Sequence, residues 1–443
     1  MHGLDGADPR RARVLEIAGG DGLNAMAMAA AYPDAQFVSF DLAPSAVAQG
    51  QAMADAAGLA NARIMVGDIV DLAERLEGSF DYVIAHGLYA WVSPEVQQAT
   101  LRLIDRVLSP EGIAYISYNA MPGGHLRMAV RQMLLRRLEG VTEPEERLKQ
   151  ALDFLEDFGK PKEGDGASQA ALRRIARLIV EKNAHTLFHD ELGEWYDPKS
   201  LTQICAEAGE HHLAYLTEAQ PGGLFHGLPG RDLDDPQVVR LAQQVDDDDV
   251  CFFHQSLFIR PGRAPLRRLD LDALARLLIC ASPGLSREGE FEFAIAGNRF
   301  ETDDADLAEF LDLLVRERPL RVPLVHFTTD EARGLAILNL VNRGILELHS
   351  LPFPGVLNAG PRPQTTSLTR ALIAGDQQQV LTLDHRSLMV VEQAPRQVLA
   401  LLDGSLTLEE VCERWDRDVK GPDIRIDAVS AITQLARAGL LCA

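Results

Sequence analysis

Cysteine is scarce in this sequence, and long apolar runs are missing from it. The five cysteines lie far apart along 443 residues and form no CxxC pair. This spacing excludes a disulfide framework and predicts reduced thiols. No apolar run approaches the roughly 20 residues that a membrane-spanning helix needs. We therefore expect a cytoplasmic protein that does not insert into a membrane.

Positive charge is also in short supply. The chain has 43 lysines and arginines against 65 aspartates and glutamates, which gives a formal net charge of −22. Because such a chain repels phosphate backbones, nucleic-acid binding is disfavoured. The excess of acid suits a basic protein partner, although it also serves solubility alone. The composition is otherwise that of a globular protein, and the length predicts about three domains.

What the sequence does contain, in its first quarter, is a regular alternation of apolar strands and helices. This alternation predicts a parallel sheet covered on both faces, in an α/β Rossmann-like fold. The ligand of such a sheet sits beyond the carboxyl ends of its strands. The predicted strands span residues 13–18, 36–41, 62–68, 80–86 and 112–119, with later strands at 213–216 and, antiparallel, at 251–260. The predicted helices span residues 22–32, 44–57, 95–108 and 125–138.

Glycines and acids gather where these strands end. The first strand is followed by Gly19, Gly20 and Gly22, the second ends in Asp41, and the third ends in Asp68. Glycines let a ligand approach the backbone, and amides that open a helix attract an anion. Asp41 could accept hydrogen bonds from a ribose diol, and Asp68 could accept one from an adenine amino group. Each residue alone is as easily structural, for example as a helix cap, but their order predicts a nucleotide-like cofactor.

Two cofactors fit this pattern. Residues 20–25, GDGLNA, satisfy the G-x-G-x-x-A fingerprint of a dinucleotide site, with Asp41 at about the expected spacing. Glu16, inside the first strand, resembles instead the E-x-G-x-G motif of class I methyltransferases, and Asp68 and residues 80–92 resemble that superfamily as well. We therefore expect S-adenosyl-L-methionine. The expected cofactor-binding residues are Glu16, Ala18, Gly19, Gly20, Gly22, Asn24, Asp41, Leu42, Gly67, Asp68, Ile69, Ala85 and His86.

Three further motifs narrow the family. They are HGLYAWV at residues 86–92, ISYNAMPGGH at 116–125 and HTLFHDEL at 185–192. Together they are similar to the bacterial methyltransferases that carry a methyltransferase regulatory domain, a group that includes the rickettsial protein-lysine methyltransferases. The resemblance covers residues 13–260 well and the rest loosely. It implies methyl transfer to lysines of a protein substrate. A small-molecule acceptor, or a cofactor-binding scaffold without transfer, stays open as an alternative.

Two motifs depart from the family pattern. Gly19 and Gly20 stand where the family usually has the Cys of E-x-G-C-G. Gly124 stands where the family usually has an aromatic residue, a change expected to open the acceptor pocket.

Aromatic residues in these motifs suggest how the acceptor is held. Tyr89, Trp91 and Tyr118 would form apolar walls and a cation–π contact for a lysine amine, because apolar walls lower the pKa of an amine. His86 or His125 would take the proton. Alternatively, Tyr89 and Trp91 simply pack against the following helix. No metal-ligand spacing stands out, so we expect no metal. The candidate catalytic residues are His86, Tyr89, Trp91, Tyr118, Asn119 and His125.

The expected domain organisation has three parts. A methyltransferase domain covers residues 1–262, with a helical insertion at about 125–195 that covers the site or mediates a homodimer. The first helix of this insertion is arginine-rich, and we expect its basic face to be solvated. Residues 246–249 are expected to form a solvated loop. Residues 263–356 and 368–443 resemble winged-helix units. The last helix offers a single arginine, so protein interaction is favoured over DNA binding.

Overall fold

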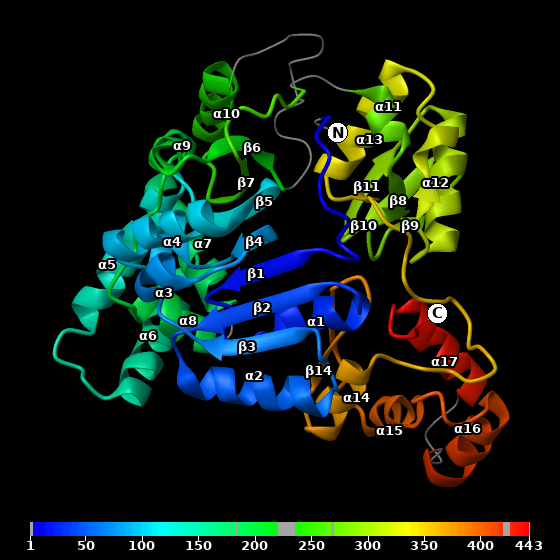
Figure 1. The fold of residues 1–443 in the computed structure, drawn as a ribbon. Helices are drawn as coiled ribbons and strands as arrows, with labels where there is room; N and C mark the ends of the chain where they lie inside the picture. The colour runs from blue at the N-terminus through cyan, green and yellow to red at the C-terminus, as the bar shows by residue number, and fades with distance from the viewer. Residues whose placement is uncertain (1–2, 182–183, 220–234, 267–269, 420–425, 443) are drawn as a thin grey trace. The chain divides into compact units, whose positions relative to one another are not determined.

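Figure 1 shows the computed structural model, which describes residues 3–181, 184–219, 235–266, 270–419 and 426–442. Residues 182–183 of the predicted helical insertion therefore lie outside the described residues. Contacts divide the chain into two compact units. The first unit contains Met1–Gly67 and Ala264–Ala443, and the second contains Asp68–Ala219 and Leu233–Arg263.

The first unit begins with three parallel strands and two helices. The strands are β1 (Arg13–Ile17), β2 (Gln36–Asp41) and β3 (Ala62–Val66), and the helices are α1 (Leu23–Ala31) and α2 (Pro44–Ala56). β2 pairs in parallel with both β1 and β3. All residues of β1 after the first are buried, as expected for a strand covered on both faces. These elements confirm the predicted ones to within one or two residues at each end.

The second unit continues the sheet. Its elements are α3 (Ile69–Arg75), β4 (Phe80–Ala85), η1 (Tyr89–Trp91), α4 (Pro94–Val107), β5 (Leu108–Asn119), α9 (Leu201–Glu210), β6 (Ala214–Glu218), α10 (Asp235–Asp249) and β7 (Phe253–Ile259). β4 and β5 are parallel, whereas β7 is antiparallel to both β5 and β6. This pairing confirms the antiparallel strand predicted near the end of the sheet.

The strands form one seven-stranded sheet in the order β3-β2-β1-β4-β5-β7-β6 (Figure 1). The strand order reverses between β1 and β4. In doubly wound sheets this switch point is where ligands bind, beyond the carboxyl ends of the strands. The α/β Rossmann-like fold predicted from the alternation of strands and helices is therefore confirmed.

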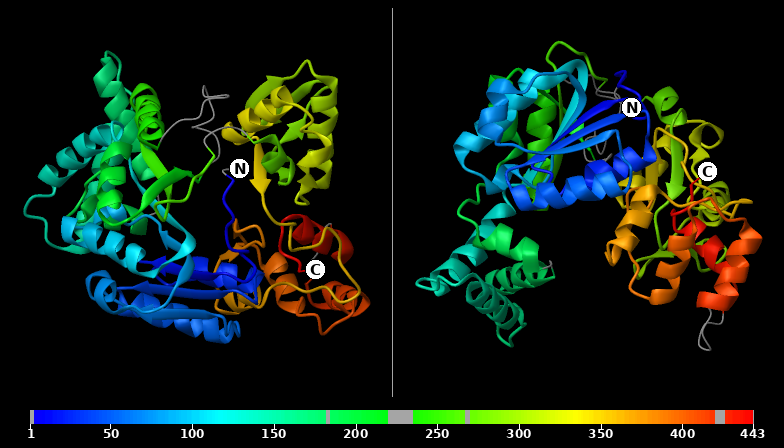
Figure 2. Two further views of the ribbon diagram at one scale, coloured as in Figure 1. Left: turned by 45° about the horizontal axis from the view of Figure 1, so that its top comes forward. Right: turned by 60° about the horizontal axis from the view of Figure 1, so that its bottom comes forward.

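Four helices between β5 and α9 have a core of their own. They are α5 (Gly124–Arg137), α6 (Pro144–Gly159), α7 (Ala167–Val180) and α8 (Ala184–Leu192), which Figure 2 shows from two further sides. Buried Val130 and Leu134 of α5 pack in this core with Leu155 of α6. The prediction that the basic face of α5 is solvated is wrong for Arg131, which is buried and donates to the backbone oxygen of Gly193.

Helix α10 corrects a second prediction. Residues 246–249 form its last turn, whereas a solvated loop was expected. Asp246 is buried, and its carboxylate hydrogen-bonds the imidazole of His254 on β7. A run of four aspartates is typical of solvent-exposed chain, and only the position of β7 shows that the first of them faces inward.

The C-terminal part of the first unit starts with an α+β cluster. Its elements are α11 (Leu271–Ala275), β8 (Leu278–Ala281), β9 (Ser286–Arg287), β10 (Glu292–Ile295), β11 (Asn298–Glu301), α12 (Ala305–Glu317), β12 (Val322–Pro323), η2 (Leu324–His326), α13 (Glu331–Asn342) and β13 (Leu346–His349). The strands form two small sheets, in the orders β12-β8-β13 and β11-β10-β9. Leu311 of α12 and Ile337 of α13 are fully buried in the core between these elements.

The last elements of the first unit follow after a connecting segment. They are α14 (Ser367–Ala374), β14 (Gln379–Leu381), β15 (Ser387–Met389), α15 (Gln393–Leu401), α16 (Leu408–Arg414), η3 (Trp415–Val419) and α17 (Ala428–Arg437). Helix α14 contacts α1 and α2, so it packs against the two helices that connect β1, β2 and β3. The winged-helix-like domains at 263–356 and 368–443 stay a prediction. Across the described residues, no helix combines the length and the apolar character needed to cross a membrane.

Candidate active site

The segment after β1 forms a tight loop that leads into α1. Ala18, Gly20 and Gly22 have positive φ angles of 54°, 62° and 70°, in a region that favours glycine. The N–H of Gly22 donates to the backbone oxygen of Gly19 at 2.9 Å. A Cβ on Gly19 would lie 2.1 Å from Ser39 Oγ. Backbone conformation therefore explains two of the predicted glycines, and close packing explains the third.

Beneath this loop lies the buried carboxylate of Glu16. Asn24 Nδ2 donates to Glu16 Oε1 at 2.7 Å, and Ser39 Oγ donates to Oε2 at 2.9 Å. Burial raises the pKa of Glu16, although these two hydrogen bonds oppose the shift. Glu16 and Asn24 were predicted to bind the cofactor. The structure places their side chains in contact with each other, where they hold the loop in shape.

Asp41, at the end of β2, is held by two backbone amides. Its Oδ2 accepts from the N–H of Gly20 at 2.9 Å, and its Oδ1 accepts from the N–H of Ala43 at 2.9 Å. The N–H of Gly67 donates to the backbone oxygen of Asp41 at 2.9 Å and so ties the end of β3 to that of β2. A carboxylate can accept about four hydrogen bonds, so Asp41 retains the capacity to accept two from a ribose diol.

An apolar platform borders Asp41. Leu42 is 67% exposed and Val66, the last residue of β3, is 50% exposed. A Cβ on Gly20 would meet no atom within 4 Å, so the space over this glycine is open. Exposed apolar side chains beside a fixed carboxylate fit a ligand with a flat ring and a ribose. Leu42 is among the residues expected to bind the cofactor. Val66 is not, although an apolar residue at the end of the third strand was a usable signal.

The second unit begins with the remaining acid. Asp68 is exposed and caps α3, because its Oδ1 accepts from the N–H of Val70 at 2.8 Å. The helix cap is therefore confirmed, and it leaves acceptor capacity for an adenine amino group, a contact that stays a prediction. Ile69 is the first residue of α3. Ala85 is fully buried at the end of β4, so its predicted contact with the cofactor stays a prediction.

His86 follows β4 and faces two hydroxyl groups. Its Nδ1 lies 3.1 Å from Tyr115 Oη and 3.0 Å from Ser117 Oγ. Burial lowers the pKa of His86, which favours a neutral ring. The ring of Phe253 meets it edge-on, with the ring centroids 6.4 Å apart.

Phe252 and Phe253 were missed by the sequence analysis. Phe253 is 44% exposed and pairs with Asn119 of β5, while Phe252 is 41% exposed. Phe253 thus places an exposed apolar ring beside His86, and Phe252 precedes it in the chain; we call these two residues the apolar rim. The adjacent aromatics in CFFHQ were the available signal, but their distance in sequence from the other motifs concealed their position.

Two of the predicted acceptor-wall residues belong to the core. Tyr89 is fully buried, and its hydroxyl donates to Glu207 Oε2 at 2.6 Å. Tyr118 is 1% exposed, and its hydroxyl lies 3.1 Å from Ser256 Oγ. Burial raises the pKa of both tyrosines. Their rings are therefore enclosed by protein, which corrects the expectation that they line an acceptor channel.

Trp91 already has a cation on its ring. The guanidinium of Arg127 lies 4.7 Å from the centroid of the Trp91 ring, and the ring of Tyr196 lies tilted against Trp91 with the centroids 4.8 Å apart. Arg127 is in turn ion-paired with the buried carboxylate of Glu191. We expected an acceptor amine to form this cation–π contact. In the structure, Arg127 of α5 forms it. This cluster fastens η1 to the helical insertion.

The remaining predicted residues lie on the segment between β5 and α5. Asn119 is 7% exposed, and its backbone oxygen accepts from the N–H of Lys199 at 3.0 Å. His125 is exposed in the first turn of α5. A Cβ on Gly124 would lie 2.6 Å from Pro198 Cβ. The glycine therefore accommodates a close neighbour, and the expectation that it opens the acceptor pocket is wrong.

Strand order, the loop of Gly19 to Gly22 and Asp41 at the end of β2 define a class I S-adenosylmethionine-dependent methyltransferase. A family model described as "Methyltransferase domain" matches residues 14–112. The Rickettsia prowazekii protein RP028 is 33% identical over 195 residues, which are 44% of this chain and 78% of RP028. The chain belongs to the same family as RP028.

Solved structures share the fold over nearly the whole chain. PKMT2 from Rickettsia typhi superposes with a TM-score of 0.81 and 21% identity, covering 99% of this chain and 96% of PKMT2. PKMT2 in complex with AdoHcy gives a TM-score of 0.80.

A second Rickettsia prowazekii protein, RP789, is 30% identical over 251 residues, and this chain covers only 44% of its length.

The cofactor of this enzyme is S-adenosylmethionine. The residues present fit it, because Asp41 is fixed for a ribose, Leu42 and Val66 expose an apolar face for a base, and Gly20 leaves space over the backbone. When bound, the cofactor supplies a methyl group already activated by a sulfonium.

Proposed function

We propose that this methyltransferase transfers methyl groups to lysine side chains of a protein substrate. The observation that carries the proposal is the correspondence with PKMT2, which extends over 99% of this chain and so includes the C-terminal region as well as the sheet. The motifs HGLYAWV and ISYNAMPGGH add their resemblance to the rickettsial protein-lysine methyltransferases. A net charge of −22 favours encounter with a basic substrate.

In this proposal the chain's main contribution is alignment. Asp41, Asp68 and the loop at Gly20 hold the cofactor, and Glu16 keeps that loop in shape from below. Holding nucleophile, methyl and sulfur in line contributes up to about 7–11 kcal/mol in well-oriented systems. Little acid–base chemistry is needed beyond loss of the amine proton.

The acceptor amine would approach over the apolar rim of Phe252 and Phe253. An apolar surface disfavours the charged ammonium, so it lowers the amine pKa and promotes the nucleophilic form. Ser117 Oγ accepts the N–H of Gly87 at 2.8 Å and can direct its own proton to His86 Nδ1. The ring proton of His86 then lies on Nε2, which makes the ring a hydrogen-bond donor. We assign His86 to orienting the acceptor, with the amine proton released to solvent. Roles for Trp91, Asn119 and His125 stay predictions.

Methyl-labelled S-adenosylmethionine tests the proposal directly. The purified enzyme is incubated with the label and a whole-cell lysate, and protein bands and small molecules are counted separately. The proposal expects label in protein, with mass spectrometry placing the added methyl mass on lysine. Label in small molecules alone, or methyl on a carboxylate or hydroxyl, would reject the lysine assignment. Retained cofactor binding without any transfer would identify a scaffold instead.

A further inference from the structure

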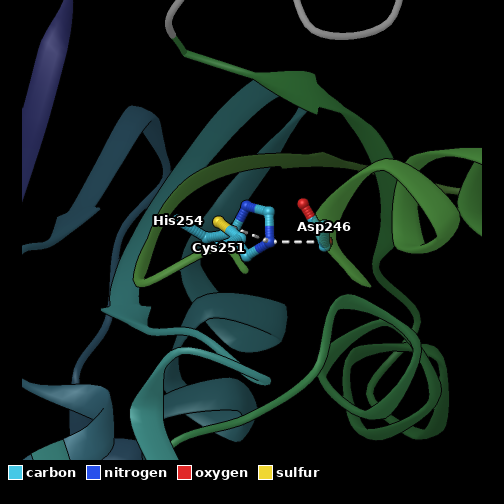
Figure 3. Close-up of side chains that lie close together, drawn as sticks. All are labelled: Asp246, Cys251 and His254. Atoms are coloured by element: carbon cyan, nitrogen blue, oxygen red, sulfur yellow. Dashed lines mark hydrogen bonds and ion pairs between the residues drawn. The ribbon is translucent and has the colours of Figure 1, made fainter. Parts of the chain in front are cut away.

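Three side chains with metal-binding atoms converge at the start of β7 (Figure 3). Asp246 comes from the last turn of α10, Cys251 from the turn that follows, and His254 from β7. His254 Nε2 lies 2.9 Å from Asp246 Oδ2 and 3.9 Å from Cys251 Sγ. All three ligand atoms lie within 4.8 Å of one another. The three side chains therefore present oxygen, sulfur and nitrogen to one point.

A carboxylate on the far side of the ring orients His254. Glu218 Oε2 lies 3.1 Å from His254 Nδ1. Glu218 is itself held, since it accepts from the N–H of Gln255 at 2.8 Å and from Ser256 Oγ at 2.7 Å. Metal-binding histidines almost always donate their second ring N–H to such a carboxylate, which fixes the ring and leaves the other nitrogen for the metal. His254 therefore already has such a carboxylate partner, Glu218, on its Nδ1.

The charge in this pocket is unbalanced. The side chains of Asp246 and Glu218 are 10% and 21% exposed, and that of His254 is 6% exposed. Among the residues that the structure describes, neither carboxylate forms an ion pair with a lysine or arginine. Two carboxylates thus share at most one imidazolium. A divalent cation that replaces this ring proton and the thiol proton of Cys251 would leave the net charge of the cluster unchanged, so it adds no unpaired charge.

We infer that Asp246, Cys251 and His254 form a binding site for a zinc-class divalent cation. Thiolate, imidazole and carboxylate are all zinc ligands, with bonds of about 2.0–2.3 Å. Tetrahedral geometry then separates the ligand atoms by about 3.3–3.6 Å. The observed separations of 2.9 and 3.9 Å bracket this range, so small rotations of the side chains suffice. Three protein ligands leave a fourth position for water.

The site would fasten the segment that follows β5. The backbone oxygen of Cys251 accepts from the N–H of Gly123 at 2.9 Å, and that of Phe252 accepts from Ala120 at 2.9 Å. The ring of His254 lies against Tyr118, with centroids 5.3 Å apart. A bound cation would therefore hold the turn that carries Phe252 against the segment that leads into α5.

Without a cation, the same residues form a hydrogen-bonded clamp. Burial lowers the pKa of His254, but hydrogen bonds to Asp246 and Glu218 outweigh it and raise the pKa to about 12. A purely structural clamp of this kind and a metal site differ in one measurable property, which is the affinity for a divalent cation.

A second cluster provides the matched control. Cys280 Sγ lies 3.2 Å from His349 Nε2, and Glu347 is close by. There Glu347 is ion-paired with Arg386, whose charge repels a cation. This cluster holds a thiol and an imidazole as the proposed site does, but it should not bind the same ion.

The test titrates Co²⁺ into the full chain after treatment with a chelator. We expect a thiolate-to-cobalt absorption band that saturates at about one ion per chain and is displaced by Zn²⁺. Cys251→Ser, a nearly isosteric change at a half-buried position, should remove the band, and Cys280→Ser should leave it unchanged. No band, a band that survives in Cys251→Ser, or loss of the band in Cys280→Ser would overturn the inference.

Glu218→Gln provides a second measurement. Removing the carboxylate that orients His254 should weaken Zn²⁺ binding about 10- to 100-fold, the usual effect of such a partner. Circular dichroism checks that each variant folds. If Glu218→Gln does not fold, the comparison of Cys251→Ser with Cys280→Ser tests the inference. Unchanged affinity in a folded Glu218→Gln would contradict the assigned role of Glu218. None of these measurements depends on methyl transfer, so they succeed or fail independently of the proposed function.

Discussion

Replacing Asp41 by asparagine tests the cofactor site at its most connected residue. The carboxylate accepts backbone N–H groups from Gly20 at 2.9 Å and from Ala43 at 2.9 Å, one on each oxygen. Asparagine retains one acceptor oxygen and presents an amide NH₂ where the second oxygen was. One ribose hydroxyl then loses its charged acceptor, and one backbone amide faces another donor.

The expected loss follows from these contacts. A hydrogen bond to a charged group contributes about 1.5–3 kcal/mol, so losing one of the two ribose bonds should weaken cofactor binding about 10- to 150-fold. Loss of one loop contact should lower the free energy of unfolding by only about 0.5–1.5 kcal/mol. The variant should therefore fold and bind poorly, which separates a binding role from a folding role.

Isothermal titration with S-adenosylhomocysteine measures this loss. Asp55→Asn is the matched control, because Asp55 is an exposed acid on α2 whose side chain, among the described hydrogen bonds, accepts only from Gln51 at 2.8 Å. Its affinity should equal that of the unmodified enzyme. Equal affinity in Asp41→Asn would refute the assignment of Asp41 to the ribose, and saturable NADH binding that requires Asp41 would assign the site to a dinucleotide.

Three other predictions concern the acceptor rim, the glycine loop and the C-terminal region. Phe253→Ala should lower kcat/KM for the protein acceptor at least several-fold without changing cofactor affinity. Phe291→Ala, at another exposed phenylalanine, should change neither. Equal losses of kcat/KM in both variants would show that the apolar rim does not bind the acceptor. Gly19→Ala should lower the free energy of unfolding by about 1–3 kcal/mol, because its Cβ would lie 2.1 Å from a serine oxygen on β2. Gly209→Ala, which meets no atom within 4 Å, should not destabilise the chain in the same thermal melt. Burial and a nearby arginine lower the pKa of His349 to about 4, so the fold favours its neutral form. The free energy of unfolding should therefore fall as the pH falls from about 6.5 to 4. His349→Gln should weaken this pH dependence, and an unchanged dependence would contradict the prediction.

The sequence by itself determined the sheet, the glycine loop and the acids at the strand ends. Strand and helix periodicity is local, and the loop follows β1 directly, so Gly20 and Asp41 are separated by a single helix. Contacts of this kind depend on turns and capping within a few tens of residues. Their geometry was therefore predictable, down to Asp68, which follows the end of β3 and caps α3.

Only the tertiary structure decided which side chains from distant parts of the sequence meet. Phe253 reaches His86 because β7 pairs antiparallel with β5 in a register that places it opposite Asn119. Arg127 covers Trp91 because the helical insertion folds back on η1. Asp246 meets His254 because α10 ends against the start of β7. Each of these pairs depends on strand register and on packing between elements, which no local sequence pattern specifies. The long chain segment between the two residues of a pair can adopt many conformations, so it does not determine whether they meet.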